Sequence, residues 1–252
     1  MKIIIAPAKK MLSSIDYMEA ETTPLFIQES EQLKRYMQTL DVPSLKKILG
    51  CSEAIAVQAY QMYQTMNLHD ALVPALLAFD GIQYTYMAPH IFETKWYDYA
   101  RQHLYILSGF YGVLRAFDGV VPYRLEINNP FHTDFCSSLY DFWKDKIYQA
   151  IIKEDQDILD LASAQHSHIV QKFVTPNVRY VKCYFMEDDG IQLREKGVYV
   201  KMARGAMVRY LSENNILDFE GVKTFHELGY RFDEAKSDTS HYIFVRKQKL
   251  KR

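Results

Sequence analysis

The segment that most constrains the fold is a stretch of strict alternation near residue 180. Within residues 178–186, two sets of side chains alternate: Tyr180, Lys182 and Tyr184 against Val181, Cys183 and Phe185. A period of two is typical of a half-buried β-strand. Asp188-Asp189-Gly190 then forms a turn signal, which predicts a hairpin into residues 191–194. The chain must therefore contain a sheet with at least one hairpin.

Apolar runs and amphipathic segments intermix along the rest of the chain. Extended segments are predicted at residues 3–6, 104–107, 120–127, 158–161, 198–201 and 242–245. Helices are predicted at residues 25–40, 43–49, 53–66, 94–102, 138–153 and 203–211. No repeat or linker divides residues 1–252. The patterns predict an α+β fold: a single compact domain with a mixed β-sheet and surrounding helices.

Composition narrows the classes of function. The 30 Lys and Arg residues are balanced by 31 Asp and Glu, so any nucleic-acid surface must be a local patch. Cys51, Cys136 and Cys183 are far apart, which indicates free thiols in a reducing compartment. No apolar run approaches the ~18 residues of a membrane span. We therefore expect a cytoplasmic protein with no membrane partner.

The chain shows no complete metal-binding or cofactor-binding motif. His166 and His168 sit close together, but the local sequence offers no third ligand. No phosphate-binding loop, dinucleotide fingerprint or nucleophile elbow occurs. The sequence predicts neither a metal site nor a cofactor.

The first candidate site is Lys9. It follows a predicted strand that ends at Pro7, and Lys10 adds a second cation. A lysine just beyond a strand end is well placed to meet a phosphate in a crevice. The alternative is a solvated pair of surface lysines.

The second candidate is the segment 107–115. Gly109 and Gly112 flank two aromatic residues, and a hairpin there could turn its amides outward to hold a phosphate. Arg115 would add charge. A purely structural turn is the alternative.

The third candidate is Pro122-Tyr123-Arg124-Leu125-Glu126. In an extended segment Arg124 and Glu126 point to the same side. This pair suits phosphate recognition beside an acid/base group. A plain ion pair of little energetic value is the alternative.

The fourth candidate is the stretch 191–211, which holds five cations and one acid. Lys201, Arg204 and Arg209 lie where a predicted strand leads into a helix, and helix N-termini favour anions. Phosphate contact and a solvated face are both open here.

Taken in order, these patches resemble the YaaA family. The resemblance rests on segments spread over nearly the whole chain: Ala6–Lys9, Leu107–Arg115, Pro122–Ile127, Phe142-Trp143, Leu161-Ala162-Ser163, Lys201–Gly205 and Gly229-Tyr230-Arg231-Phe232. It implies one compact, cannon-shaped mixed domain with a helix-hairpin-helix-like element and a basic cleft that binds DNA. It also implies peroxide protection by limiting free iron.

On this reading, DNA is the expected partner, held by backbone contacts with low sequence preference. The expected DNA or phosphate contacts are Lys9, Gly109, Gly112, Arg115, Arg124, Lys201, Arg204 and Arg209.

The chain departs from the family pattern at several positions: Ala6, Ile82, Asn128, Gln165, His166 and Met202. The motif cations remain, while a hydroxyl and acids are lost. The resemblance therefore implies that anion binding is kept.

The alternative function is an enzyme acting on a nucleotide or nucleic-acid base. Glu126 would be its acid/base group, with Arg124 and Lys201 on phosphate. Such an enzyme needs a pocket where Glu126, Lys9 and Arg204 converge, whereas a duplex binder needs cations along a longer groove. Because Gln165 cannot carry a proton, we expect binding without robust turnover.

Overall fold

A computed structural model of the protein describes residues 1–247. Its main sheet is built on five parallel strands: β1 (Lys2–Ile5), β5 (Leu104–Ser108), β8 (Asp157–Asp160), β9 (Arg179–Asp188) and β12 (His241–Lys247). Three antiparallel strands extend it: β6 (Gly112–Arg115) on β5, β10 (Leu193–Arg194) on β9, and β11 (Arg231–Phe232) on β12. The order is β11-β12-β9-β8-β1-β5-β6, with β10 off this path. The predicted α+β fold with a mixed sheet is confirmed.

Two small ribbons join the loops around this sheet. They pair β2 (Lys10–Met11) with β4 (Phe79–Asp80), and β3 (Val73–Pro74) with β7 (Gly119–Val120). The first ribbon fixes the chain that leaves β1, since Lys10 lies opposite Asp80.

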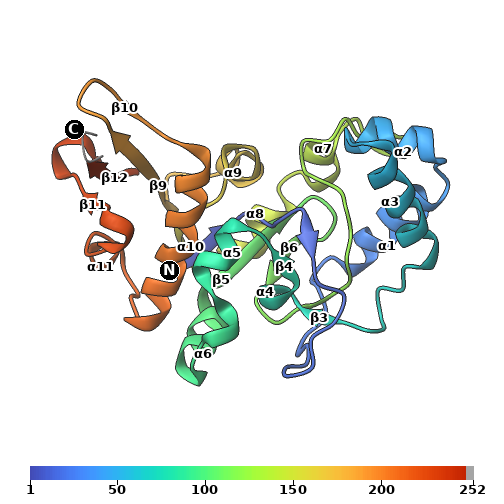
Figure 1. The fold of residues 1–252 in the computed structure, drawn as a ribbon, viewed down its shortest axis with the longest axis horizontal. Helices are drawn as coiled ribbons and strands as arrows, with labels where there is room; N and C mark the ends of the chain where they lie inside the picture. The colour runs from blue at the N-terminus through green and yellow to red at the C-terminus, as the bar shows by residue number, and fades with distance from the viewer. Residues whose placement is uncertain (248–252) are drawn as a thin grey trace.

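Helices fill the connections between the strands. Their bounds are α1 (Ile27–Gln38), α2 (Val42–Leu49), α3 (Glu53–Thr65), α4 (Ala75–Ala78), α5 (Ile82–Met87), α6 (Thr94–His103), α7 (Leu139–Trp143), α8 (Lys146–Ile152), α9 (Ala164–Gln171), α10 (Gly197–Glu213) and α11 (Phe219–Val222). Short 3-10 turns occupy Pro89–Ile91, Glu227–Gly229 and Glu234–Lys236. Figure 1 shows α1, α2 and α3 gathered at one end of the molecule and β10, β11 and β12 at the other.

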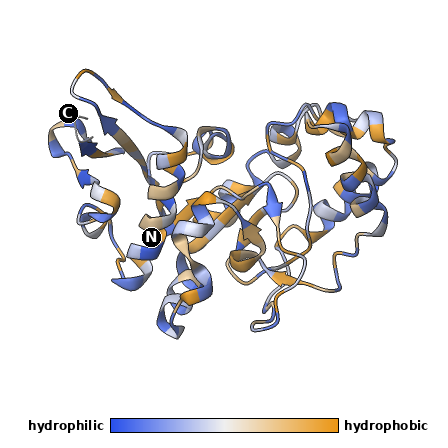
Figure 2. Ribbon diagram, in the orientation of Figure 1, coloured by the Kyte–Doolittle hydropathy of each residue, from blue (hydrophilic) through white to orange (hydrophobic). Residues whose placement is uncertain are grey.

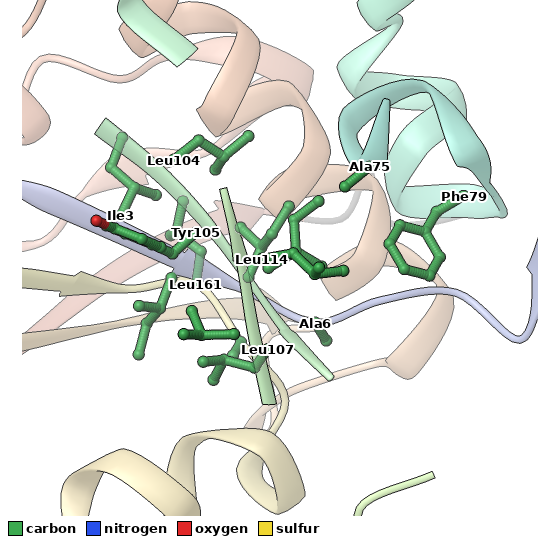
Figure 3. Close-up of a cluster of buried hydrophobic side chains, with 14 of the residues drawn as sticks. Ile3, Ala6, Ala75, Phe79, Leu104, Tyr105, Leu107, Leu114 and Leu161 are labelled. Atoms are coloured by element: carbon green, nitrogen blue, oxygen red, sulfur yellow. The ribbon is translucent and has the colours of Figure 1, made fainter. Parts of the chain in front are cut away.

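The core lies on the central strands. Ile3, Ile4 and Ile5 of β1 are completely buried, as expected for a parallel strand covered on both faces. Figure 3 shows Ile3 beside Leu104 and Tyr105 of β5, with Leu161 and Leu107 nearby. In Figure 2 the hydrophobic colour follows these strands through the middle of the molecule.

The alternating segment behaves as predicted. It forms β9, and its turn at residues 188–190 leads into β10. The amide of Gly190 donates to the Asp188 side chain, which fixes the turn.

Two predicted elements are wrong in detail. The predicted helix 138–153 is two helices, because Lys144 adopts a left-handed φ of 46° between α7 and α8. The break seats Trp143, whose Nε1 donates to the Gly109 carbonyl. The predicted strand at 198–201 is instead the first turn of α10, where Tyr199 stacks against the Arg246 guanidinium. Tertiary packing overrides β-propensity there.

The segment 120–127 is extended but only Gly119–Val120 pairs as a strand. Pro122 has no amide hydrogen to donate to a ladder. The predicted alternation still holds, since Tyr123, Leu125 and Ile127 are buried while Arg124 and Glu126 are partly exposed.

The sheet has a switch point between β1 and β8. From β1 the next parallel strand along the chain, β5, lies on one side, whereas from β8 the next strand, β9, lies on the other. The loops that leave these two neighbouring strands therefore diverge at their carboxyl ends. In open sheets of this kind, ligands bind in the crevice that the divergence creates.

Candidate anion pocket

A small pocket lies at the carboxyl end of β1, on the switch point. It is lined by Pro7–Lys9, Tyr123–Glu126 and His166. Its volume is about 40 Å³. A buried water needs about 10–15 Å³ of such space, so the pocket has room for roughly three water-sized groups.

Gly109 positions one wall of this pocket. A Cβ added at Gly109 would lie 2.7 Å from the Leu125 carbonyl oxygen, so only glycine lets the segment 123–127 lie against the β5 turn. Ser108 donates a hydrogen bond to the Tyr123 hydroxyl at 2.7 Å, which anchors the same segment. With Tyr123 and Leu125 buried, Arg124 and Glu126 are turned to the accessible side.

Lys9 and Glu126 meet at the mouth of the pocket. Lys9 Nζ lies 2.7 Å from Glu126 Oε1, and the two side chains are 64% and 27% exposed. The Glu126 amide donates to Asn129 Oδ1, which holds the end of the segment. An ion pair this exposed contributes about 0–1 kcal/mol, so Lys9 can leave it at little cost.

His166 forms the inner wall. It lies in the first turn of α9, directly after β8, and its Nδ1 is 2.8 Å from Ser163 Oγ. Burial lowers the pKa of His166 to about 4, with Arg204 adding to the effect and Glu126 and Asp160 opposing it. The imidazole is therefore neutral at neutral pH. Its buried Nε2 has no hydrogen-bond partner within residues 1–247.

Two guanidinium groups share this feature. The Nε atoms of Arg124 and Arg204 are buried and have no hydrogen-bond partner in the described chain. Burial also lowers the pKa of Arg204, despite the nearby carboxylates of Glu195 and Asp160. A buried donor left unpaired costs about 1–3 kcal/mol. Unpartnered buried nitrogens in the pocket wall and beside it are therefore best explained by a ligand.

Behind His166 lies a buried ionic network. Asp160, at the end of β8, accepts from Lys182 Nζ at 2.6 Å, from the Tyr180 hydroxyl at 2.7 Å and from the Ala162 amide. Lys182 Nζ also donates to Ser167 Oγ of α9. These bonds tie the start of α9 to the sheet and so fix the position of His166.

Comparisons with known proteins agree with the sequence patterns. A family model described as "Peroxide stress protein YaaA" matches residues 1–236. A UPF0246 protein of Desulfitobacterium hafniense (strain Y51) is 49% identical over 246 residues, covering 98% of each chain. A UPF0246 protein of Agathobacter rectalis is 40% identical, covering 98% of this chain and 99% of the relative. One of Lachnoclostridium phytofermentans is 41% identical, over 98% and 96% of the two chains.

The chain belongs to the YaaA peroxide stress family. The resemblance found in the sequence is confirmed, and the motifs that carry it can now be placed. Lys9, Arg124 and Glu126 of this YaaA-family protein line one pocket, and Arg204 lies close enough to affect the pKa of His166. Lys201 is exposed three residues before Arg204 on α10, and so on the same side of that helix.

Arg115 does not join this group. It lies opposite Tyr105, toward the amino end of β5, whereas the pocket lies near the carboxyl end. Its Nε and Nη2 donate to the fully buried Asp118 carboxylate at 3.0 and 2.8 Å, and Nη2 also donates to the Thr23 carbonyl. Arg115, which was grouped with Lys9 as an expected phosphate contact, therefore lies at the other end of the sheet, because the short β5–β6 hairpin carries it there.

The amides of the glycine turn do not face outward as predicted. The Phe110 and Tyr111 amides donate to Ser108 Oγ inside the protein. Gly112 has a φ of 73° and packs against the Trp143 ring. The turn joins two strands, so no helix-hairpin-helix-like element forms at Gly109 and Gly112. These glycines serve close packing.

Arg209 also lies apart from the pocket. Farther along α10, its guanidinium faces Glu213 at 3.5 Å and Glu227 at 3.9 Å. Its charge is thus balanced locally, which suits a structural cation.

Position 165 does not supply the acid/base group that the family motif suggested. Gln165 is exposed and is not among the residues that line the pocket, whereas the next residue, His166, is buried in its wall. Sequence reasoning also missed the roles of Asp160 and Lys182. One sequence signal for the buried histidine was present. Ser163 and His166 are three residues apart at the start of a helix that follows a strand.

Residues 1–247 contain no group of three or more His, Cys, Asp or Glu side chains arranged to hold a metal ion. No helix among them is long and apolar enough to span a membrane.

Proposed function

We propose that this YaaA-family protein contributes to the peroxide stress response by binding DNA in the cytoplasm through phosphate groups. One observation carries the proposal: two cations from distant segments, Lys9 and Arg124, line one pocket, and a third, Arg204, lies near its His166 wall. Lys9 comes from the end of β1, Arg124 from the segment after β7, and Arg204 from α10. Lys201 extends the positive charge along α10.

Phosphate contacts fix a protein on DNA without reading its sequence. Lysine and arginine side chains dominate this site, so we expect a low preference for sequence. The four cations Lys9, Arg124, Lys201 and Arg204 predict a log–log salt slope no steeper than about −4 for duplex DNA. Binding that does not weaken with salt contradicts the proposal.

Fluorescence anisotropy with a labelled oligonucleotide tests these contacts. Lys9→Ala and Arg124→Met should each weaken binding several-fold and make the salt slope shallower by about 1. Arg209→Gln is the matched control, because it removes a cation from α10 outside the pocket. An equal loss in all three variants argues for unspecific charge attraction instead.

The link to iron is a further part of the proposal. Following the role implied by the family, we propose that the protein helps limit free iron during peroxide exposure. Cells lacking the protein should then contain more chelatable iron after peroxide treatment. Restoring the wild-type chain should reverse this rise, and restoring Arg124→Met should not.

A second candidate is an enzyme acting on a nucleotide or nucleic-acid base. The specific observation in its favour is that Glu126 and the neutral His166 line the same pocket. Two acid/base groups of this kind can transfer protons across a reacting bond, with Arg124 and Lys201 on phosphate. Turnover of nucleotides or damaged DNA by the wild-type chain, abolished by Glu126→Gln, supports this candidate. Binding without turnover supports the first.

A further inference from the structure

The shape of the pocket limits what it can accept. It is enclosed by the chain leaving β1 on one side, by residues 123–126 on another, and by His166 at its inner end. Its enclosed space is small, about 40 Å³. Roughly three water-sized groups fit, which is the size of the oxygens of one phosphate group.

Buried nitrogen atoms without hydrogen-bond partners lie in and near the inner end of the pocket. His166 is only 7% exposed, and its unpartnered Nε2 lies in the pocket wall. Arg124 contributes an unpartnered Nε from the adjacent wall. Arg204, also 7% exposed, lies near His166 and lacks a partner for Nε. A group with several acceptor oxygens and negative charge complements this set.

The start of α9 also favours an anionic ligand. Ser163 is its N-cap residue, yet the hydroxyl bonds to His166 and makes no capping hydrogen bond. Amides in the first turn of a helix bind anions readily. This helix end and the buried His166 lie together at the carboxyl end of β8, beside β1.

From this geometry we infer that the pocket receives a terminal phosphate group, that is, a phosphomonoester on a free nucleotide or on the end of a nucleic-acid strand. A phosphodiester inside a strand has a nucleoside attached to two of its oxygens. The pocket would need an opening for each of the two attached chains. A terminal phosphate carries one, so its free oxygens can reach His166 while the nucleoside stays outside. Glu126 on the rim disfavours an anion, and Lys9 beside it offsets that charge.

This inference rests on the proposed DNA phosphate binding and makes it more specific. The test compares one single-stranded oligonucleotide in three forms: 5′-phosphorylated, 3′-phosphorylated and with hydroxyls at both ends. Thymidine monophosphate and thymidine form a second pair, which separates a free nucleotide from a strand end. We expect at least one phosphorylated form to bind about tenfold tighter than its hydroxyl counterpart.

Variants show whether the preference arises in the pocket. His166→Gln and Arg124→Met should each reduce the preference for phosphorylated ligands to about twofold or less. Arg209→Gln should keep it. Thermal unfolding of each variant confirms that it is folded. If His166→Gln does not fold, Arg124→Met alone tests whether the preference arises in the pocket.

The possible outcomes distinguish the terminal-phosphate site from the proposed DNA binding. Equal binding of phosphorylated and hydroxyl forms overturns the inference and leaves DNA binding standing. Tighter binding of thymidine monophosphate without any binding of strands supports the terminal-phosphate site and overturns DNA binding. Absence of binding to every probe overturns both.

Discussion

At the scale of single residues, the ion pair between Lys9 and Glu126 controls access to the pocket. We expect Glu126→Gln to lower the free energy of unfolding by less than about 1 kcal/mol, because the pair is exposed. Affinity for inorganic phosphate should rise a few-fold, since Lys9 no longer has a competing carboxylate. Urea unfolding and calorimetric titration measure the two effects. A fall in phosphate affinity contradicts this role for Glu126.

Arg115 is a cation that stabilises the fold and lies outside the pocket. Asp118 is completely buried and accepts from the Arg115 side chain, the Arg115 amide and the Thr22 hydroxyl. Arg115→Met leaves that carboxylate without its charged partner, and breaking such a pair costs about 3–5 kcal/mol. Chemical unfolding should show this loss. Where the variant is still folded, its affinity for DNA should match the wild type, and a selective loss of DNA binding disproves the structural role.

At the scale of elements, the contact between α5 and α10 places Arg204. A Cβ added at Gly205 would lie 1.9 Å from the Gln83 carbonyl oxygen of α5, so the two helices can approach only at glycine. We expect Gly205→Ala to force them apart and to destabilise the protein by about 1–3 kcal/mol or more. Phosphate binding should weaken as well, because Arg204 moves with the helix.

Gly197 supplies the matched control for that experiment. It begins the same helix, and a Cβ there would meet nothing within 4 Å. Because alanine favours helix over glycine by up to about 1 kcal/mol, Gly197→Ala should be neutral or slightly stabilising. Thermal unfolding of the two variants side by side tests the claim. Equal effects would show that helix propensity, and not close packing, governs α10.

At the scale of the whole molecule, His166 couples folding to pH. Its pKa is about 4 in the folded protein against an ordinary value of 6.5. Between these values the unfolded chain binds a proton that the folded chain does not, so stability falls as pH falls from 6.5 toward 4. The full loss is on the order of 3 kcal/mol, of which about 2 kcal/mol appears by pH 5.

Urea unfolding at pH 7.5 and pH 5 measures this dependence. His166→Gln should lose about 2 kcal/mol less than the wild type between the two conditions. The variant is needed as a reference because His103, which is also partly buried, has a lowered pKa and contributes in the same direction. Identical losses in the two proteins contradict a neutral, buried His166.

Local pattern predicted much of this structure. The alternation at 178–186 identified β9, because side chains in a strand alternate between two faces whatever surrounds them. The same local rule placed Arg124 and Glu126 on one side of their segment. Lys9 was predicted at a strand end because Pro7 ends the apolar run. Each of these conclusions depends on backbone geometry over a few residues.

Only the tertiary structure decided which cations belong to the pocket. Arg115 and Arg124 look equivalent in sequence, yet the Asp118 carboxylate and the Thr23 carbonyl hold Arg115 at the far end of the sheet. His166 and Arg204 are buried with unpartnered nitrogen atoms because strands β8 and β1 and helix α10 meet around them. Charge pairing and burial depend on which distant segments approach one another, and that information is not carried by local periodicity.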